Sequence, residues 1–326
     1  MNALEMTIEQ ITYEHYFPAK RRRGRATDTL DGYASSARLY VIPMWGDRPI
    51  TGITRDEVQD WVDELAQRPE TGPGGAWKAY KTLRQVVRWA MAKWSLFVAD
   101  PTLGIEEPRR KTYRPETLTE RRLKRLIRGM VGCQVEAAVV VSSSLGTRPS
   151  ETYAVRWERV NWRTGEVPVD TALITASDGT LERPTKTIKG ERSGYLPPWA
   201  LDRLHQIWVG LGRPKGRIIG ELKPSQVAYR VKTWIKRHRL PKITMKNLRH
   251  TWGTIAAKSG VKIETVAAMM GHSNIQVTYR YYYSLDAATS KTAQRRVARR
   301  ILGKTCDDMY RGIPLAPAPV ELPLAA

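Results

Sequence analysis

Four short segments in the second half of the sequence carry side chains that suit chemistry on a phosphate group. In the first, Arg148 follows a turn that contains Gly146 and precedes Pro149, a residue favoured at the first position of a helix. A guanidinium at a helix N-terminus can bind a phosphate in a bidentate manner, and Glu151 is placed to orient it. Taken alone, an exposed Arg–Glu pair is the simpler interpretation, so this segment has to be judged together with the other three.

The second and third segments add further cations. Lys186 and Lys189 lie in Pro184–Arg192, a basic stretch typical of a β-hairpin. A lysine on such a turn can reach into a groove and donate a proton to a leaving oxygen. Lys246 and Arg249 are three residues apart, so they share one helix face and could straddle one phosphate. Taken alone, the second segment would be interpreted as a solvated loop, and the third is equally compatible with a solvated basic helix.

The fourth segment, Gly271–Tyr283, is rich in tyrosine. Four of its last five residues are Tyr, and a helix cannot bury all of them. A phenol can act as a nucleophile in covalent catalysis. This cluster is therefore a candidate for the reacting group.

The charge of the chain indicates a polyanionic partner. The formal net charge is +22 and the sequence pI is about 10.1. Residues 1–110 hold 16 Lys and Arg against 15 Asp and Glu, whereas residues 111–326 hold 38 against 17. Because the excess is spread through sequence with ordinary core patterning, we expect a nucleic acid as the partner.

Composition disfavours several other classes of protein. Cys133 and Cys306 are far apart and have no Cys or His nearby at ligand spacing, so we expect reduced thiols and neither a disulfide framework nor a metal site. No run approaches the roughly 18 apolar residues of a membrane span, and residues 1–10 lack the features of a signal peptide. We expect no contact with a membrane and a cytoplasmic location.

The first third of the chain predicts a helical DNA-binding domain over residues 1–107. Thr29–Pro43 is the first segment with helical spacing, Thr54–Glu57 is a capping box, and a long helix with one apolar face runs from Trp77 to Trp94. The cations expected to contact DNA lie on the other faces of the long helix and in the basic run near the N-terminus: Lys78, Lys81, Arg84, Arg88, Arg22 and Arg23.

The rest of the chain predicts a linker, a mixed domain and a tail. The polar, Pro-containing residues 108–116 are typical of a linker. The second domain, 117–303, begins with a capping box at Thr117–Glu120 and contains a buried helix at Val135–Leu145. Its short β-like runs are Val160–Trp162, Ala172–Thr175 and Ser193–Leu196. Residues 286–302 have the pattern of a basic amphipathic helix, and residues 304–326 are expected to be disordered.

Taken together, the four segments resemble the tyrosine recombinase family, of the phage-integrase type. Their order and spacing are those of a Gly-x-Arg-x-x-Glu element, a β-hairpin Lys, an x-x-Leu-Arg-His element, and Gly-His-Ser with a Tyr nine residues after the His. The likeness covers residues 117–285, and the capped helix of the first domain resembles the family's core-binding domain. It implies a mainly α fold with a small β-sheet: a helical core-binding domain followed by a mixed α/β catalytic domain.

The resemblance also implies a role for each candidate residue. The enzyme would cut and rejoin DNA through a 3′-phosphotyrosyl intermediate, without cofactor, metal or ATP. The implied roles are the following: Arg148 and Arg249 hold the scissile phosphate with Glu151 in support, Lys186 is the general acid, His272 supports the phosphate and the nucleophile, and Tyr281 attacks.

Position 246 departs from the family pattern, in which His is usual. An ammonium supplies three donors and a positive charge, but with a reference pKa of about 10.4 it does not accept a proton at neutral pH. We therefore expect Lys246 to act as an electrostatic stabiliser.

Several roles remain open within and beyond this chemistry. We favour a compact integrase of a phage or mobile element that lacks an evident N-terminal arm-binding domain; a Xer-type resolvase, an invertase and a DNA-binding regulator that has lost catalysis are the alternatives. The expected partners are double-stranded attachment or core sites, a homotetramer on two duplexes and an accessory DNA-bending or directionality factor. The helix predicted at 286–302 would dock on a neighbouring protomer in that tetramer.

Overall fold

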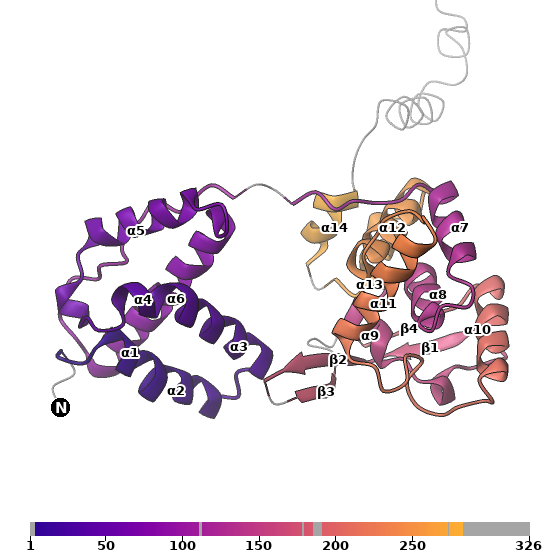
Figure 1. Cartoon of the computed structure of the whole chain (residues 1–326), viewed down its shortest axis with the longest axis horizontal. Coiled ribbons are helices and arrows are strands. Elements are labelled where there is room, and N and C mark those ends of the chain that lie inside the picture. The colour runs from indigo at the N-terminus through magenta and orange to yellow at the C-terminus, as the bar shows by residue number, and fades with distance from the viewer. Residues whose placement is uncertain (1–3, 111–112, 178, 185–190, 273, 283–326) are drawn as a thin grey trace, which may run out of the picture.

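The computed structural model describes residues 4–110, 113–177, 179–184, 191–272 and 274–282. Over these residues the chain forms two helical units, the second of which also carries short strands (Figure 1). The predicted class, mainly α with a small amount of β structure, is confirmed.

The first unit is entirely helical over its described residues. Its elements are α1 (Ile8–Gln10), η1 (Ile11–Tyr16), α2 (Phe17–Arg22), α3 (Thr27–Ser36), η2 (Ala37–Val41), α4 (Ile42–Trp45), η3 (Ile50–Gly52), α5 (Arg55–Gln67) and α6 (Gly72–Trp94). Helix therefore starts at Ile8, well before the first helix that the sequence predicted. Thr54 caps α5 in a capping box with Glu57, as its sequence predicted.

Two π-helical turns in this unit have a common cause. The turns η1 and η2 each come shortly before a proline, Pro18 and Pro43. A proline lacks the N–H that an α-helix needs and its ring crowds the carbonyl four residues earlier, so a wider turn lets the helix continue. Ile11 and Val41 lie in these turns, and both are buried in the core.

The second unit combines helices with two antiparallel strand pairs. Its elements are α7 (Glu120–Gly129), α8 (Glu136–Leu145), α9 (Pro149–Ala154), η4 (Trp157–Arg159), β1 (Glu166–Val169), β2 (Thr171–Ala176), β3 (Gly179–Pro184), β4 (Arg192–Tyr195), α10 (Pro198–Gly210), α11 (Pro224–Arg237), α12 (Met245–Lys258), α13 (Ile263–Met270) and α14 (Ile275–Tyr282). Strand β1 pairs with β4, and β2 pairs with β3. The register places Val167 opposite Gly194 and Leu173 opposite Glu182.

Two local predictions in this unit are wrong. Val160–Trp162 is not a strand, because the Val160 amide donates to the Trp157 carbonyl and closes the 3₁₀ turn η4. The cap of α7 is Thr119, whose hydroxyl accepts from the Arg122 amide, and not Thr117. The Leu118 amide donates instead to Thr251 in α12, which holds this segment against the unit before the helix starts.

Each unit has its own hydrophobic core. The first is built around large, fully buried side chains that include Tyr16, Trp45 and Tyr80. The second is larger, with α8 at its centre: most of Glu136–Leu145 is buried, as its apolar sequence predicted.

The two units are joined at two separate places (Figure 1). One is the covalent segment between α6 and α7. The other is the β2–β3 hairpin, which reaches α3 of the first unit and contacts it through Ser177 and Arg183. None of the helices in the described residues is long and apolar enough to span a bilayer.

Candidate active site

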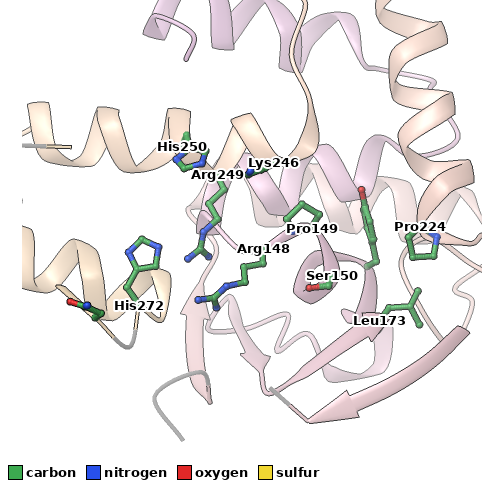
Figure 2. Close-up of a pocket in the computed structure, with 11 residues that line it drawn as sticks. Arg148, Pro149, Ser150, Leu173, Pro224, Lys246, Arg249, His250 and His272 are labelled. Atoms are coloured by element: carbon green, nitrogen blue, oxygen red, sulfur yellow. The ribbon is translucent and has the colours of Figure 1, made fainter. Parts of the chain in front are cut away.

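A cavity of about 620 Å³ lies in the second unit where α9, α12 and the turn after α13 meet (Figure 2). Its lining residues are Arg148, Pro149, Ser150, Tyr153, Leu173, Pro224, Lys246, Arg249, His250, His272 and Asn274. They include three cations and no carboxylate. Such a lining attracts an anion, and the sequence had predicted four of these residues as catalytic candidates.

Arg148 lies directly before α9, as its Pro149 predicted. The preceding Gly146 has a φ of +60°, and a Cβ at that position would lie 2.5 Å from the Trp252 ring, so the turn requires glycine. The Arg148 amide and Nη1 both donate to Glu151, at 2.8 and 2.6 Å. Its Nη2 donates to the Gly271 carbonyl at 2.8 Å. Both ends of Arg148 are thus held while its guanidinium faces the cavity.

Arg249 is the more deeply buried of the two arginines, with 7% of its side chain exposed. Its Nη1 donates to the Gly146 carbonyl at 3.0 Å and its Nη2 to the Met270 carbonyl at 2.7 Å. Figure 2 shows its guanidinium beside that of Arg148, both directed toward the part of the cavity next to His272. Two guanidinium groups, one from the residue directly before α9 and one from α12, therefore converge on the cavity.

A third arginine, Arg192, completes this arrangement and was given no role by the sequence analysis. It lies at the start of β4, with 11% of its side chain exposed, and its Nη2 donates to Glu151 at 2.9 Å. Its position at the end of the basic hairpin stretch was visible in the sequence. What was not visible is that it shares a carboxylate with Arg148.

Glu151 is the shared partner of these arginines. Its side chain is 2% exposed. Burial alone would raise its pKa, but the hydrogen bond and charge of Arg192, together with Arg148, hold the pKa of Glu151 below its usual value. One buried carboxylate thus orients several guanidinium groups and leaves a net positive charge for a ligand.

The C-terminal end of α13 holds the same three arginines. The carbonyl of Met269 accepts from Arg192, that of Met270 from Arg249, and that of Gly271 from Arg148. The last carbonyls of a helix have no partner within the helix and carry partial negative charge, so cations bind them well. The packing of α13 therefore sets the positions of all three guanidinium groups.

His272 follows this helix end and faces the cavity. Its Nδ1 is 2.7 Å from the hydroxyl of the buried Thr278. Burial, followed by the charges of Arg249 and Arg148, lowers the pKa of His272 to about 4. The imidazole is therefore neutral at pH 7.

Lys246 lies in the first turn of α12 and also lines the cavity. Its Nζ lies 4.6 Å from the ring centroid of Tyr113, a residue of the segment between the two units. The neighbouring His250 has a pKa lowered to about 4, first by burial and then by the charge of Lys246. Tyr113 is the second residue of this site that the sequence analysis missed.

The tyrosine-rich segment forms the helix α14, and Tyr281 belongs to its last turn. The Tyr281 side chain lies outside what the structure describes. Tyr279 of the same helix is engaged elsewhere, since its hydroxyl donates to Glu264 at 3.0 Å. Lys186 and Lys189 lie outside the described residues.

The cations predicted for the first unit lie on its surface and several have acidic partners. Lys81 contacts Glu107 at 2.5 Å, Arg84 lies 3.9 Å from the same carboxylate, and Arg88 pairs with Asp100 at 2.9 Å. These three also line a second cavity, of about 450 Å³, together with Lys20, Gln85 and Trp89. Lys78, Arg22 and Arg23 are exposed.

No group of three or more His, Cys, Asp or Glu side chains that could hold a metal ion occurs within the described part of the chain. The charged side chains that line the main cavity are instead those of Arg148, Lys246 and Arg249. These bind anions.

The sequence and the fold of this chain are similar to those of known proteins. Residues 116–288 match the model of the phage integrase family. The tyrosine recombinase XerD of Pseudomonas aeruginosa is 27% identical over 280 residues, which cover 79% of this chain and 87% of XerD. The integrase of Mycobacterium phage D29 is 21% identical over 304 residues, covering 90% of this chain and 79% of the integrase.

Among solved structures, the fold is similar to that of the integrase of transposon Tn1549, determined with the DNA of the transposon right end. The TM-score is 0.73 at 16% sequence identity, and the match covers 90% of this chain and all of the integrase chain. Both helical units therefore have counterparts in one known fold.

Proposed function

We propose that this chain, which belongs to the phage integrase family and is a tyrosine site-specific recombinase, integrates and excises the DNA of a phage or another mobile element. We propose the domain division 1–107, 108–116 and 117–303, with residues 304–326 as a tail. We propose that its partners are double-stranded attachment sites. We also propose that it acts on DNA in the cytoplasm of a bacterial host.

The observation that carries the proposed chemistry is the convergence of Arg148 and Arg249 on one cavity. They are oriented by Glu151 and by the end of α13 before any ligand arrives. Fixed donors that need no reorganisation stabilise the charge that develops on a phosphate in the transition state. In this proposal the two guanidinium groups bind the non-bridging oxygens of the scissile phosphate, and the ammonium of Lys246 adds a third charge.

The reaction then follows from the groups around that phosphate. The Tyr281 oxygen attacks phosphorus, the bond to the 5′-oxygen breaks, and a 3′-phosphotyrosyl forms. Lys186 donates the proton that the leaving 5′-oxygen needs. The Tyr281 phenol loses its proton as it attacks, and the neutral imidazole of His272 beside the phosphate accepts that proton in this proposal. Since the phosphodiester energy is kept in the new bond, a 5′-hydroxyl of a second duplex can reverse the step.

A nicked suicide duplex that carries the binding site tests this chemistry. We expect the wild-type protein to become covalently attached to DNA, and Tyr281→Phe to bind DNA and form no adduct. Tyr279→Phe is the matched control and should retain the adduct, because Tyr279 bonds Glu264. An adduct with Tyr281→Phe and none with Tyr282→Phe would move the nucleophile by one residue, and no adduct with wild type would favour a DNA-binding regulator.

Alanine substitutions test the two phosphate-binding arginines. Arg148→Ala and Arg249→Ala should each slow cleavage by roughly a hundred- to a thousandfold, since removal of one positioned donor costs about 3–4 kcal/mol. DNA affinity should fall much less, because many other cations contact the backbone. If each substitution lowered the DNA affinity by as much as it lowered the cleavage rate, the two arginines would act in DNA binding only.

The biological role requires the DNA target. Sequencing of the DNA that is covalently attached to the protein in cells should recover junctions between a mobile element and the host chromosome. Recovery of one host site paired with itself would instead support a Xer-type resolvase, a role that the similarity to XerD keeps open.

We propose that the active complex is a tetramer on two duplexes, held together by the segment at 286–302, which lies outside the described residues. An apolar set at helical spacing beside basic residues suits docking on a neighbouring protomer. A chain that ends after Tyr283 should bind a single half-site and fail to pair two sites. Wild-type recombination by that chain would exclude this role.

A further inference from the structure

We propose that Tyr113 is a positioning residue that holds the ammonium of Lys246 in the cavity through a cation–π contact. This inference rests on the proposed function, because it assigns a partner to one of the catalytic cations. Tyr113 belongs to neither helical unit: it lies in the irregular segment between α6 and α7.

The Tyr113 side chain is held by its hydroxyl group as well as by contacts of its ring. The Lys246 Nζ lies 4.6 Å from the ring centroid, within the roughly 6 Å over which a ring face attracts a cation. The Tyr113 hydroxyl donates to Oδ1 of Asn247 at 2.9 Å, and Asn247 is buried. The ring also makes a tilted contact with His250, with centroids 6.3 Å apart. The hydroxyl bond and the two ring contacts fix the plane on which the ammonium rests.

The rest of this segment is tied to the same helix. The Leu118 amide donates to the Thr251 hydroxyl at 3.1 Å, one turn further along α12 than Asn247. The segment thus lies along the first two turns of α12. The contact between Tyr113 and Lys246 is therefore part of a continuous packing of the segment on the helix that carries Arg249.

A lysine in this place needs such a partner. Its four-carbon side chain is flexible, and the positive charge of the nearby Arg249 repels the ammonium from the cavity. Arg148 and Arg249 are oriented by a carboxylate and helix carbonyls, whereas no carboxylate of the described residues forms an ion pair with Lys246.

An aromatic ring can orient the ammonium without neutralising its charge, which a carboxylate cannot do. The ring quadrupole attracts the ammonium but carries no net charge. Lys246 is therefore oriented while its full positive charge stays available to a phosphate. A glutamate in place of Tyr113 would orient the ammonium equally well and compete with the phosphate for it.

Single-turnover cleavage of the nicked suicide duplex, at saturating protein and pH 8, tests the inference. Tyr113→Leu removes the ring and should slow cleavage by about three- to thirtyfold, the range expected for a cation–π contact. Half-site affinity should stay at the wild-type value, and the thermal unfolding temperature should fall by a similar amount in Tyr113→Leu and Tyr113→Phe, because both lose the hydrogen bond to Asn247. Tyr113→Phe keeps the ring face and should restore most of the rate. Tyr229→Leu, which removes an exposed tyrosine of α11, is the matched control and should cleave as wild type.

The decisive measurement repeats the Tyr113→Leu comparison in a Lys246→His background, where the imidazole is neutral at pH 8. There the loss of the ring should change the rate less than about twofold, since the charge that it orients is gone. The same loss in both backgrounds, or a loss of affinity equal to the loss of rate, would show that Tyr113 acts through the fold or through binding and would overturn the inference. If wild type and Tyr113→Leu cleave at the same rate, the inference about Tyr113 is overturned and the proposed function is unaffected. If wild type forms no adduct, both the inference and the proposed function are overturned.

Discussion

Asp31 in α3 accepts two hydrogen bonds from Ser177 in the turn between β2 and β3, although 146 residues separate them in the sequence. The Ser177 amide donates at 2.7 Å and its hydroxyl at 2.8 Å, each to a different carboxylate oxygen. Arg183 of the same hairpin lies 3.3 Å from the Thr27 hydroxyl. Together with the covalent segment on the other side, this contact closes the chain into a ring of two units (Figure 1).

A disulfide at this contact should lock the protein around DNA. With Cys306 replaced by Ser, the pair Asp31→Cys and Ser177→Cys should form a disulfide under mild oxidation, because the two positions are in direct contact. If the duplex passes between the two units, the oxidised protein should stay on a circular plasmid at a salt concentration that removes wild type. Linearisation of the plasmid or addition of a thiol should release it.

The two variants that carry only one of the introduced cysteines are the controls and should leave circular DNA at the wild-type salt concentration. Release of the oxidised double variant from circular and linear DNA at the same salt concentration would mean that the duplex lies outside the ring.

Glu107 should weaken DNA binding by occupying cations of the first unit. Its carboxylate accepts from Lys81 at 2.5 Å and from the Trp77 indole at 2.8 Å, and the bond from Lys81 is the largest cause of a lowered Glu107 pKa. A phosphate that binds Lys81 has to compete with it. Glu107→Gln should raise half-site affinity and steepen the salt dependence of binding by about one phosphate contact.

Glu64→Gln is the matched control for this prediction, because Glu64 pairs with Arg68 at the end of α5. Filter binding from low to high salt measures both variants. An unchanged or weaker affinity of Glu107→Gln would show that DNA does not contact Lys81.

Arg192 should be needed for cleavage as well as for stability. Arg192→Ala removes a partner of the buried Glu151 and should lower the free energy of unfolding by about 1–3 kcal/mol. It should also slow cleavage, because Arg148 and the end of α13 lose a shared support. Arg203→Ala is the control: it removes a partner of another buried carboxylate, Glu136, remote from the cavity, and should lower stability with cleavage intact. Equal cleavage rates of the two variants would limit Arg192 to a structural role.

Stability should fall as the pH is lowered from about 6.5 to about 4. The pKa values of His272 and His250 are both lowered to about 4 in the folded protein, from the usual histidine value of 6.5. In that window the unfolded chain binds protons at these positions and the folded chain does not, so lower pH favours unfolding. Above pH 6.5 this contribution is fully present.

Urea unfolding at pH 5 and pH 7 measures the effect. His272→Gln should narrow the difference in unfolding free energy between the two pH values, and replacement of the exposed His205 of α10 should leave it as in wild type. If the unfolding free energy of His272→Gln differed between pH 5 and pH 7 by as much as that of wild type, the His272 ring would not be held neutral by its surroundings.

Local features of the chain determined much of what the sequence analysis predicted. Thr54 caps α5 because its partner Glu57 is three residues away, and Arg148 precedes a helix because Pro149 follows it. The apolar run Val135–Leu145 is a buried helix. Each of these depends on residues within one or two turns, which a single sequence displays directly. The order and spacing of the motifs likewise grouped Arg148, Lys246, Arg249 and His272, and these four side chains line one cavity.

Tertiary structure alone decided which distant groups hold those side chains in place. That Glu151 serves Arg192 as well as Arg148, that the end of α13 binds three guanidinium groups, and that Tyr113 lies under Lys246 all depend on the path of the chain between segments far apart in sequence. Val160–Trp162 has a strand-like sequence and still turns, because a local hydrogen bond to Trp157 closes there. Spacing in the sequence specifies the face of an element on which a residue lies, but the partner on the opposite side is selected only when the two cores form and bring the elements together.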